Sequence, residues 1–170
     1  MLGYRGTGKS VISKILSEKL GRKLYRVDDL IAQAAGKPIP EIVKQQGWPG
    51  FRKLECEVVA RVVSEAQDSI IDCGGGVGLD DNNIILLKKD GKCALLTASL
   101  STIIRRIKKD RNRPSLEEGL SFAEEQKKNL ADRHEKYQAS ADFICDTTSR
   151  RPGETVHEII GYFKKQGWLE

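Results

Sequence analysis

The sequence predicts an α/β domain in which helices cover a parallel sheet, and three observations support this prediction. Short apolar or β-branched runs alternate with longer segments of helical periodicity, which is typical of parallel sheets. A glycine-rich loop opens directly into one of the helical segments. The chain has 170 residues, enough for one buried core but too few for two ordinary domains. We therefore expect a single domain over residues 1–170.

The elements follow in order from short apolar runs and from helical periodicity. Strands are expected at the short runs of apolar or β-branched residues, which are 24–27, 69–73, 93–97 and 142–145. Helices are expected where longer periodic segments separate these strands, at 9–20, 51–66, 80–89, 100–109, 121–139 and 154–166. Residues 28–50 interrupt the alternation with short helices, and 110–119 is a polar, proline-containing stretch. Both are expected to be insertions around an active site.

Two of the helices show an apolar face that we expect to pack on the sheet. In the first helix this face contains Ser10, Val11, Ile15, Leu16 and Leu20. In the helix at 51–66 it contains Val58, Val59, Val62 and Val63.

Composition excludes several classes of protein. The chain is 39% hydrophobic and 31% charged, which is globular, and its apolar runs fall far short of the roughly 18 residues of a membrane-spanning helix. The N-terminus shows no apolar core of a secretory signal, so a cytoplasmic protein is expected. The four cysteines are single and lack the C-x-x-C spacing of a zinc or redox site, which favours reduced, mostly buried thiols.

The glycine-rich loop at 3–10 reads GYRGTGKS and fits the pattern G-x-x-x-x-G-K-[ST] of a phosphate-binding loop. Its backbone N–H groups can surround phosphate oxygens at the positive end of the following helix. Lys9 is expected to reach the β- and γ-phosphates of ATP, and Ser10 to bind Mg²⁺. Such a loop should follow a buried strand, yet only Met1 and Leu2 precede it. The first strand is therefore expected to be either truncated or unusually short, and truncation is favoured.

Three consecutive glycines follow the strand expected at 69–73, so they lie at the carboxyl edge of the sheet, where open α/β folds bind ligands. Three arginines stand near the ends of other predicted elements: Arg52, Arg113 and Arg133. Taken alone, each of these arginines is more typical of a solvated surface position than of a binding site. Together with a phosphate loop, they indicate a pocket that binds a carboxylate and a lid that neutralises phosphate charge.

The most basic stretch of the chain is 105–113, RRIKKDRNR, and the formal net charge is +5. Such a run could follow the phosphates of RNA. No aromatic residue lies within it to stack on bases, and it leads into the expected lid. A helix end that faces a nucleotide is therefore favoured, and no nucleic-acid or membrane partner is expected.

The order of these motifs resembles the shikimate kinase family over nearly the whole chain. The residues that carry the resemblance are the loop at 3–10, Asp28 with Ile31 and Gly36, Gly50-Phe51-Arg52 with Glu55, Gly74-Gly75-Gly76, Arg106 with Asp110 and Arg113-Pro114, and Arg133 with Tyr137. The resemblance implies a nucleoside-monophosphate-kinase-like P-loop NTPase fold, a three-layer sandwich with a five-stranded parallel sheet. It also implies a substrate-binding subdomain at 28–60 and a lid at 112–119.

The resemblance further implies transfer of the γ-phosphoryl group of ATP to the 3-hydroxyl of shikimate, with Mg²⁺, in aromatic amino acid (chorismate) biosynthesis. The implied catalytic residues are Lys9, Asp28 and Arg113. The implied ATP-binding residues are Gly3, Gly6, Thr7, Gly8, Lys9, Ser10, Arg106, Arg113, Arg150, Arg151 and Pro152. The implied shikimate-binding residues are Asp28, Arg52, Gly74, Gly75, Gly76 and Arg133, and Ser10 is the implied metal ligand.

One position departs from the family pattern. Members commonly carry an acidic residue near the magnesium where this chain has Arg26, and Asp72 is our candidate to take over part of that role. Two alternatives stay open: a related small-molecule P-loop kinase with a gluconate- or nucleotide-like acceptor, and a non-catalytic nucleotide-binding relative. His134 and His157 lack partners at ligand spacing and are expected at the surface. We expect a monomer.

Overall fold

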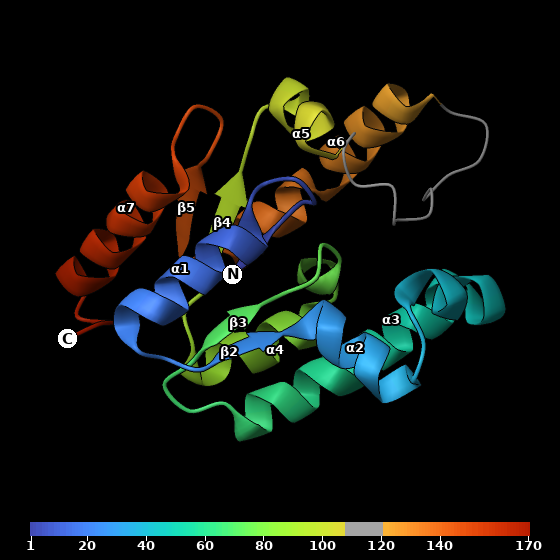
Figure 1. The fold of residues 1–170 in the computed structure, drawn as a ribbon, viewed down its shortest axis with the longest axis horizontal. Helices are drawn as coiled ribbons and strands as arrows, with labels where there is room; N and C mark the ends of the chain where they lie inside the picture. The colour runs from blue at the N-terminus through green and yellow to red at the C-terminus, as the bar shows by residue number, and fades with distance from the viewer. Residues whose placement is uncertain (108–120) are drawn as a thin grey trace.

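The computed structural model describes residues 1–107 and 121–170, so the expected lid at 112–119 and Arg113 lie outside the described residues. Strands and helices alternate along the chain, which confirms the α/β class (Figure 1). The strands are β1 (Leu2–Gly3), β2 (Leu24–Arg26), β3 (Ile70–Asp72), β4 (Ala94–Thr97) and β5 (Phe143–Asp146). The last four of these coincide with the predicted strands to within two residues.

The strands pair only in parallel, but the predicted five-stranded sheet is wrong. They form a three-stranded sheet in the order β1-β4-β5 and a two-stranded sheet of β2 and β3. In register, Leu2 pairs with Leu95 and Tyr25 with Ile71. Two hydrogen bonds of Met1, the residue before β1, link the two sheets. Met1 O accepts from Cys73 N at 3.2 Å, and the Met1 amino group donates to Ile71 O at 2.7 Å. With only two residues, β1 is too short to extend these bonds into a ladder.

The helices lie where periodicity places them. They are α1 (Lys9–Leu20), α2 (Val27–Ala35), α3 (Ile39–Glu65), α4 (Asp81–Asp90), α5 (Leu100–Ile107), α6 (Phe122–Ser140) and α7 (Pro152–Lys165), with a 3-10 turn, η1 (Val77–Leu79). The short helices expected within 28–50 are α2 and the first part of α3. Gly47, at φ 67° and ψ 179°, bends α3 before its second part, which is the helix expected at 51–66.

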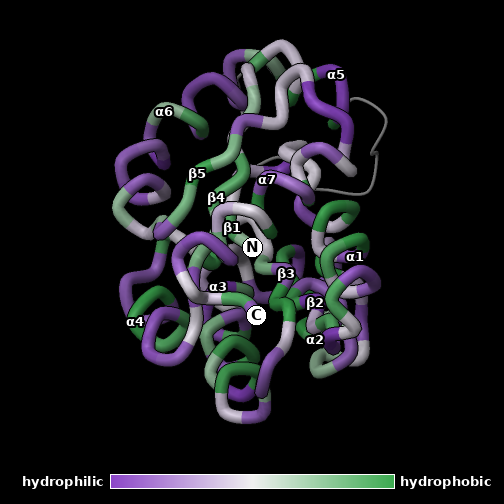
Figure 2. Tube along the Cα trace, turned by 90° about the vertical axis from the view of Figure 1, so that its left-hand side faces the viewer, coloured by the Kyte–Doolittle hydropathy of each residue, from purple (hydrophilic) through white to green (hydrophobic). Residues whose placement is uncertain are grey.

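The core lies on both faces of the strands. Leu95 belongs to a large apolar cluster on the face covered by α3, α4 and α6, and its neighbour Leu96 belongs to a second cluster with α1 and α7. This alternation follows from the two-residue period of a strand. In Figure 2 the apolar strands β4 and β5 run between helices whose outer turns are hydrophilic.

The expected face of α1 is partly wrong. Val11 is 54% exposed, whereas Ile12 and Leu16 are buried in the second cluster. The sheet therefore lies against the stripe formed by Ile12 and Leu16, four residues apart, and Val11 falls outside it. The face of α3 is confirmed, since Val58, Val59 and Val62 are at most 3% exposed.

Other sequence expectations can be compared with the described residues. The four cysteines are free thiols, three of them buried. His134 and His157 are exposed. Within the described part of the chain, no helix combines the length and the apolar character that crossing a bilayer requires.

Candidate active site

The phosphate-binding loop connects β1 to α1 and depends on its glycines. Gly3 (φ 140°) passes so close to β4 that a Cβ atom would lie 2.4 Å from Leu96 O. At Gly6 (φ 80°) a Cβ atom would lie 2.9 Å from the Ile107 side chain. Both positions combine a positive φ with a lack of space, so only glycine fits there without strain. The loop is thereby held between β4 and α5.

Lys9 and Ser10 form the first turn of α1. Lys9 is only 9% exposed, and its Nζ donates to Tyr4 O at 3.2 Å. Thr7 Oγ1 donates to the same carbonyl oxygen at 2.7 Å, which closes the loop around the lysine. Ser10 is exposed and lines the pocket beside the loop. An ammonium group and a hydroxyl therefore stand at the positive end of a helix.

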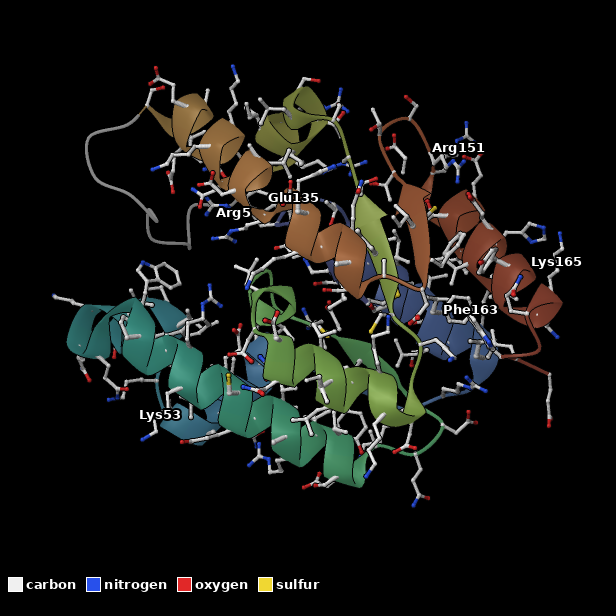
Figure 3. The ribbon with its side chains drawn as sticks, turned by 180° about the vertical axis from the view of Figure 1, so that it is seen from behind. Arg5, Lys53, Glu135, Arg151, Phe163 and Lys165 are labelled. Carbon is white, nitrogen blue, oxygen red and sulfur yellow. The ribbon has the colours of Figure 1, made fainter. Side chains whose placement is uncertain are left out.

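A pocket of about 470 Å³ opens at this loop. Most of the expected ATP-binding residues line it: Gly6, Thr7, Gly8, Lys9, Ser10, Arg106, Arg150 and Pro152. Gly3 and Arg151 do not. Gly3 packs against β4, and Arg151 precedes α7, where its backbone N–H donates to Glu154 Oε2 at 2.9 Å. Figure 3 shows Arg151 at the start of α7, on the far side of β5 from Arg5.

Arg106 reaches the phosphate loop from α5. Its Nη1 donates to Gly6 O at 3.1 Å and to Thr147 Oγ1 at 3.0 Å, and its Nη2 donates to Thr147 O at 2.8 Å. The Thr147 hydroxyl lies 2.9 Å from Thr7 O and 3.0 Å from Thr97 O, both acceptors. Thr147 therefore ties the loop to the ends of β4 and β5. Sequence reasoning missed it, and its only signal was a position just after a predicted strand.

Asp28 lies in the first turn of α2, directly after β2, where the helix dipole favours a carboxylate. It lines the same pocket as Lys9 and Ser10. Its Oδ1 approaches Gly74 so closely that a Cβ atom there would be 2.4 Å away. Arg26 and Asp72 also line this pocket, and Arg26 forms an ion pair with Asp29 at 2.9 Å.

Arg52 in α3 is held by Glu55, one turn later. Arg52 Nη1 lies 2.9 and 2.7 Å from the two carboxylate oxygens of Glu55, which is 1% exposed. Burial raises the pKa of Glu55, and the Arg52 guanidinium counteracts that shift. The guanidinium also lies against Gly76, where a Cβ atom would be 1.8 Å from Nη1. Glu55 was noticed in sequence as part of a motif, but its buried position was not foreseen.

Arg133 approaches the glycines from α6. Its Nη1 donates to Gly75 O at 3.3 Å, and its Cζ lies 5.4 Å from the ring centre of Tyr4. The Tyr137 hydroxyl donates to the same Gly75 oxygen. Each glycine of the triplet therefore has its own charged neighbour: Asp28 at Gly74, Arg133 at Gly75 and Arg52 at Gly76. The fold brings together groups from α2, α3 and α6 that lie far apart in sequence.

The chain is similar to known proteins over almost its whole length. The family model described as shikimate kinase matches residues 5–164. A shikimate kinase from Thermodesulfovibrio yellowstonii is 35% identical over 165 residues, 97% of this chain and 94% of the relative. One from Sulfurihydrogenibium sp. is 32% identical over 166 residues, 98% of this chain and 97% of the relative.

A solved structure agrees with these sequence matches. The shikimate kinase from Acinetobacter baumannii, in complex with shikimate, is similar to this chain with a TM-score of 0.90. The two are 25% identical, and the match covers 97% of this chain and 91% of that one. The fold of this chain is therefore that of the P-loop kinases, although its strand β1 is short. Sequence, fold and the arrangement of charged groups around the phosphate loop agree that the chain belongs to the shikimate kinase family.

Proposed function

We propose that the protein transfers the γ-phosphoryl group of ATP to the 3-hydroxyl group of shikimate, a step in chorismate and aromatic amino acid biosynthesis. Family membership supports the kinase activity. One observation carries the assignment of the site: Asp28, Arg52 and Arg133 surround the glycine triplet next to the phosphate loop. A carboxylate for a hydroxyl group and two guanidinium groups for a carboxylate match a small hydroxylated acid.

The donor half of the site is the phosphate loop with Lys9 and Arg106. Phosphoryl transfer has a loose transition state, so catalysis depends on positioning and on neutralising charge. Lys9 stands where the β- and γ-phosphates meet the start of α1, and it supplies that neutralisation. Arg106 holds the loop by its bond to Gly6 O and borders the space for the adenosine group, together with Arg150 and Pro152.

The acceptor half is formed by Asp28 and the two arginines. Asp28, in the first turn of α2, orients the attacking hydroxyl and accepts its proton. A guanidinium carries five N–H donors, so Arg52 can hold Glu55 through Nη1 and still offer N–H groups to the substrate. Arg133, which donates to Gly75 O, offers its remaining N–H groups to the carboxylate of the substrate as well. Gluconate also carries a carboxylate, but it is an open-chain acid and lacks the ring that holds the carboxylate and the 3-hydroxyl group of shikimate at a fixed separation.

Mg²⁺ fits the chemistry of the pocket. Mg²⁺ in phosphoryl-transfer sites is bound by one or two protein oxygens together with phosphate oxygens and water. Ser10 supplies a hydroxyl at the loop, and Asp72, 6% exposed, supplies a carboxylate in the same pocket. Among the described residues no group of three His, Cys, Asp or Glu side chains that could hold a metal ion is present. The ion would neutralise charge on the β- and γ-phosphates.

Several expectations stay predictions. They are the contribution of Arg113 and the lid at 112–119, the subdomain at 28–60, the single-domain organisation, the cytoplasmic location and the monomeric state. None of them is needed for the assignment of the donor and acceptor halves.

The test is a coupled assay of ADP release with Mg-ATP and with shikimate, quinate, gluconate or no acceptor. We expect release that depends on shikimate. Arg133→Ala should raise the KM for shikimate about tenfold to a hundredfold, because a hydrogen bond to a charged group contributes about 1.5–3 kcal/mol. Lys127→Ala, an exposed cation on the same helix, is the matched control and should change nothing.

The other outcomes identify the alternatives. Release that is faster with gluconate than with shikimate would indicate a related small-molecule kinase. ATP binding without release, whatever the acceptor, would indicate a non-catalytic nucleotide-binding relative.

A further inference from the structure

One face of α6 joins the two halves of the site. Gln126, Asn129, Arg133 and Tyr137 are spaced by three or four residues, so they lie on the same side of the helix. Arg133 and Tyr137 bind Gly75 O in the glycine triplet. Asn129 Oδ1 accepts from Arg133 Nη2 at 3.3 Å, which holds the arginine along the helix. The N-terminal end of this face, at Gln126, meets the phosphate loop instead.

Gln126 is completely buried and binds two loop residues through one atom. Its Oε1 accepts from Tyr4 Oη at 2.8 Å and from Arg5 Nε at 2.9 Å. Because an Arg Nε–H can only donate, the atom facing it must be the amide oxygen, which fixes the orientation of the side chain. Burial raises the pKa of Tyr4, which keeps its hydroxyl protonated as a donor at neutral pH.

The neighbouring contacts reinforce this junction. Arg5 also forms an ion pair with Glu125 at 3.6 Å, and the two side chains are only 11% and 4% exposed. Figure 3 shows Arg5 beside the first turns of α6. Arg5 lines the nucleotide pocket as well, so the junction includes a residue of the donor site itself.

The buried amide group of Gln126 is incompletely satisfied. Within the described residues its Nε2 has no hydrogen-bond partner, and an unpaired buried N–H group is costly. An apolar side chain of similar size would avoid that cost but could not accept from Tyr4 and Arg5. The glutamine instead pairs the buried Tyr4 hydroxyl and the Arg5 guanidinium, and it thereby fixes the loop against α6.

We infer that Gln126 is a positioning residue that sets the distance between the phosphate donor and the arginine that binds the acceptor. The inference rests on the proposed function. Arg133 follows Gln126 by seven residues, two turns of a rigid helix that rise about 10 Å. Anchoring one end of this segment to Tyr4 and Arg5 fixes Arg133 relative to the loop that holds the γ-phosphate. A displacement of about 1 Å between reacting groups can reduce a rate a hundredfold.

The test compares Gln126→Leu and Gln126→Glu with the unmodified enzyme. Gln126→Leu removes the accepting oxygen and should lower kcat about tenfold to a hundredfold, with the Kd for ATP changed less than about threefold. Gln126→Glu keeps an accepting oxygen and should keep kcat within about threefold. Asn83→Leu, in which a buried amide on α4 away from the site is replaced in the same way, is the control for exchanging a buried amide for an apolar side chain. It should leave kcat unchanged.

Hydrogen exchange gives a second readout that needs no turnover. Gln126→Leu should speed exchange of the backbone amides in 4–8 and in 129–137 together, and Asn83→Leu should affect neither segment. If the unmodified enzyme releases ADP with shikimate, an unchanged kcat in Gln126→Leu overturns the inference. If it releases none, the proposed function fails, and the exchange result alone decides the inference: an unchanged pattern overturns it.

Discussion

The glycine triplet offers a direct test of how Arg52 is positioned, through the change Gly76→Ala. Gly76 has φ −116° and ψ −15°, which alanine adopts freely, so the change introduces no backbone strain. The new Cβ atom would lie 1.8 Å from Arg52 Nη1 and 2.2 Å from its Cζ. Reaching an ordinary contact of 3.4 Å requires the guanidinium to retreat by about 1.6 Å.

Such a movement breaks the hydrogen bonds of 2.9 and 2.7 Å to Glu55. Removing the partner of a buried ion costs about 3–5 kcal/mol. Because the Arg52 side chain is 32% exposed and can move outward while keeping part of the attraction, we expect a smaller loss, about 1–3 kcal/mol in the free energy of unfolding. The KM for shikimate should rise at least about tenfold, and the Kd for ATP should stay nearly constant.

Urea denaturation and the ADP-release assay measure these two effects. Gly75→Ala is the matched control for stability, because a Cβ atom at Gly75 meets nothing closer than Arg5 N at 3.5 Å. The reasoning is refuted if Gly76→Ala and Gly75→Ala lose the same free energy of unfolding, or if Gly76→Ala leaves the KM for shikimate unchanged.

Three further predictions concern single groups of the site. Burial raises the pKa of Glu55 above its ordinary 4.5. Between pH 4.5 and the pKa of the folded state, the native state therefore binds more protons than the unfolded state. The free energy of unfolding falls as the pH rises through this window. Urea denaturation should therefore show Glu55→Gln gaining stability relative to the unmodified protein from pH 4 to pH 7, and a constant difference would contradict this. Thr147→Val removes the hydroxyl that ties the loop to β4 and should raise the KM for ATP about tenfold, measured by ADP release; Thr148→Val, one residue further on, is the control. Asp72→Asn should raise the Mg²⁺ concentration needed for half-maximal ADP release, and an unchanged requirement would exclude Asp72 from metal binding.

The order of elements could be predicted because it depends on local patterns. The helix at 9–20 was placed correctly to the residue, since a glycine precedes it and a glycine ends it. Strand pairing could not be predicted in the same way. Whether β1 pairs with β3 depends on how many backbone N–H and C=O groups of the two strands can form hydrogen bonds with each other. That number depends on the length of β1 in the folded chain.

The residues of the site also differ in whether a local sequence motif predicts them. Lys9 and Ser10 could be assigned from sequence because the contiguous motif of the phosphate loop restricts where they lie, whereas Asp28 was assigned through the resemblance to a family. Arg52 and Arg133 could be assigned to the carboxylate of shikimate only through the resemblance to a family, because each arginine alone favours a surface charge. Arg151 shows the limit of that route, since it was expected at the nucleotide and lies outside the pocket.

By itself, the sequence determined that this chain binds a nucleoside triphosphate on an α/β scaffold, because the spacing of the loop at 3–10 is a local requirement of phosphate binding. Only the tertiary structure decided which groups support the reacting ones. Thr147 behind the loop and Gln126 between the loop and α6 act through contacts between residues 140 and 122 positions apart in the sequence. No periodicity or spacing reports such contacts, because a buried hydrogen bond depends on where two backbones meet in space.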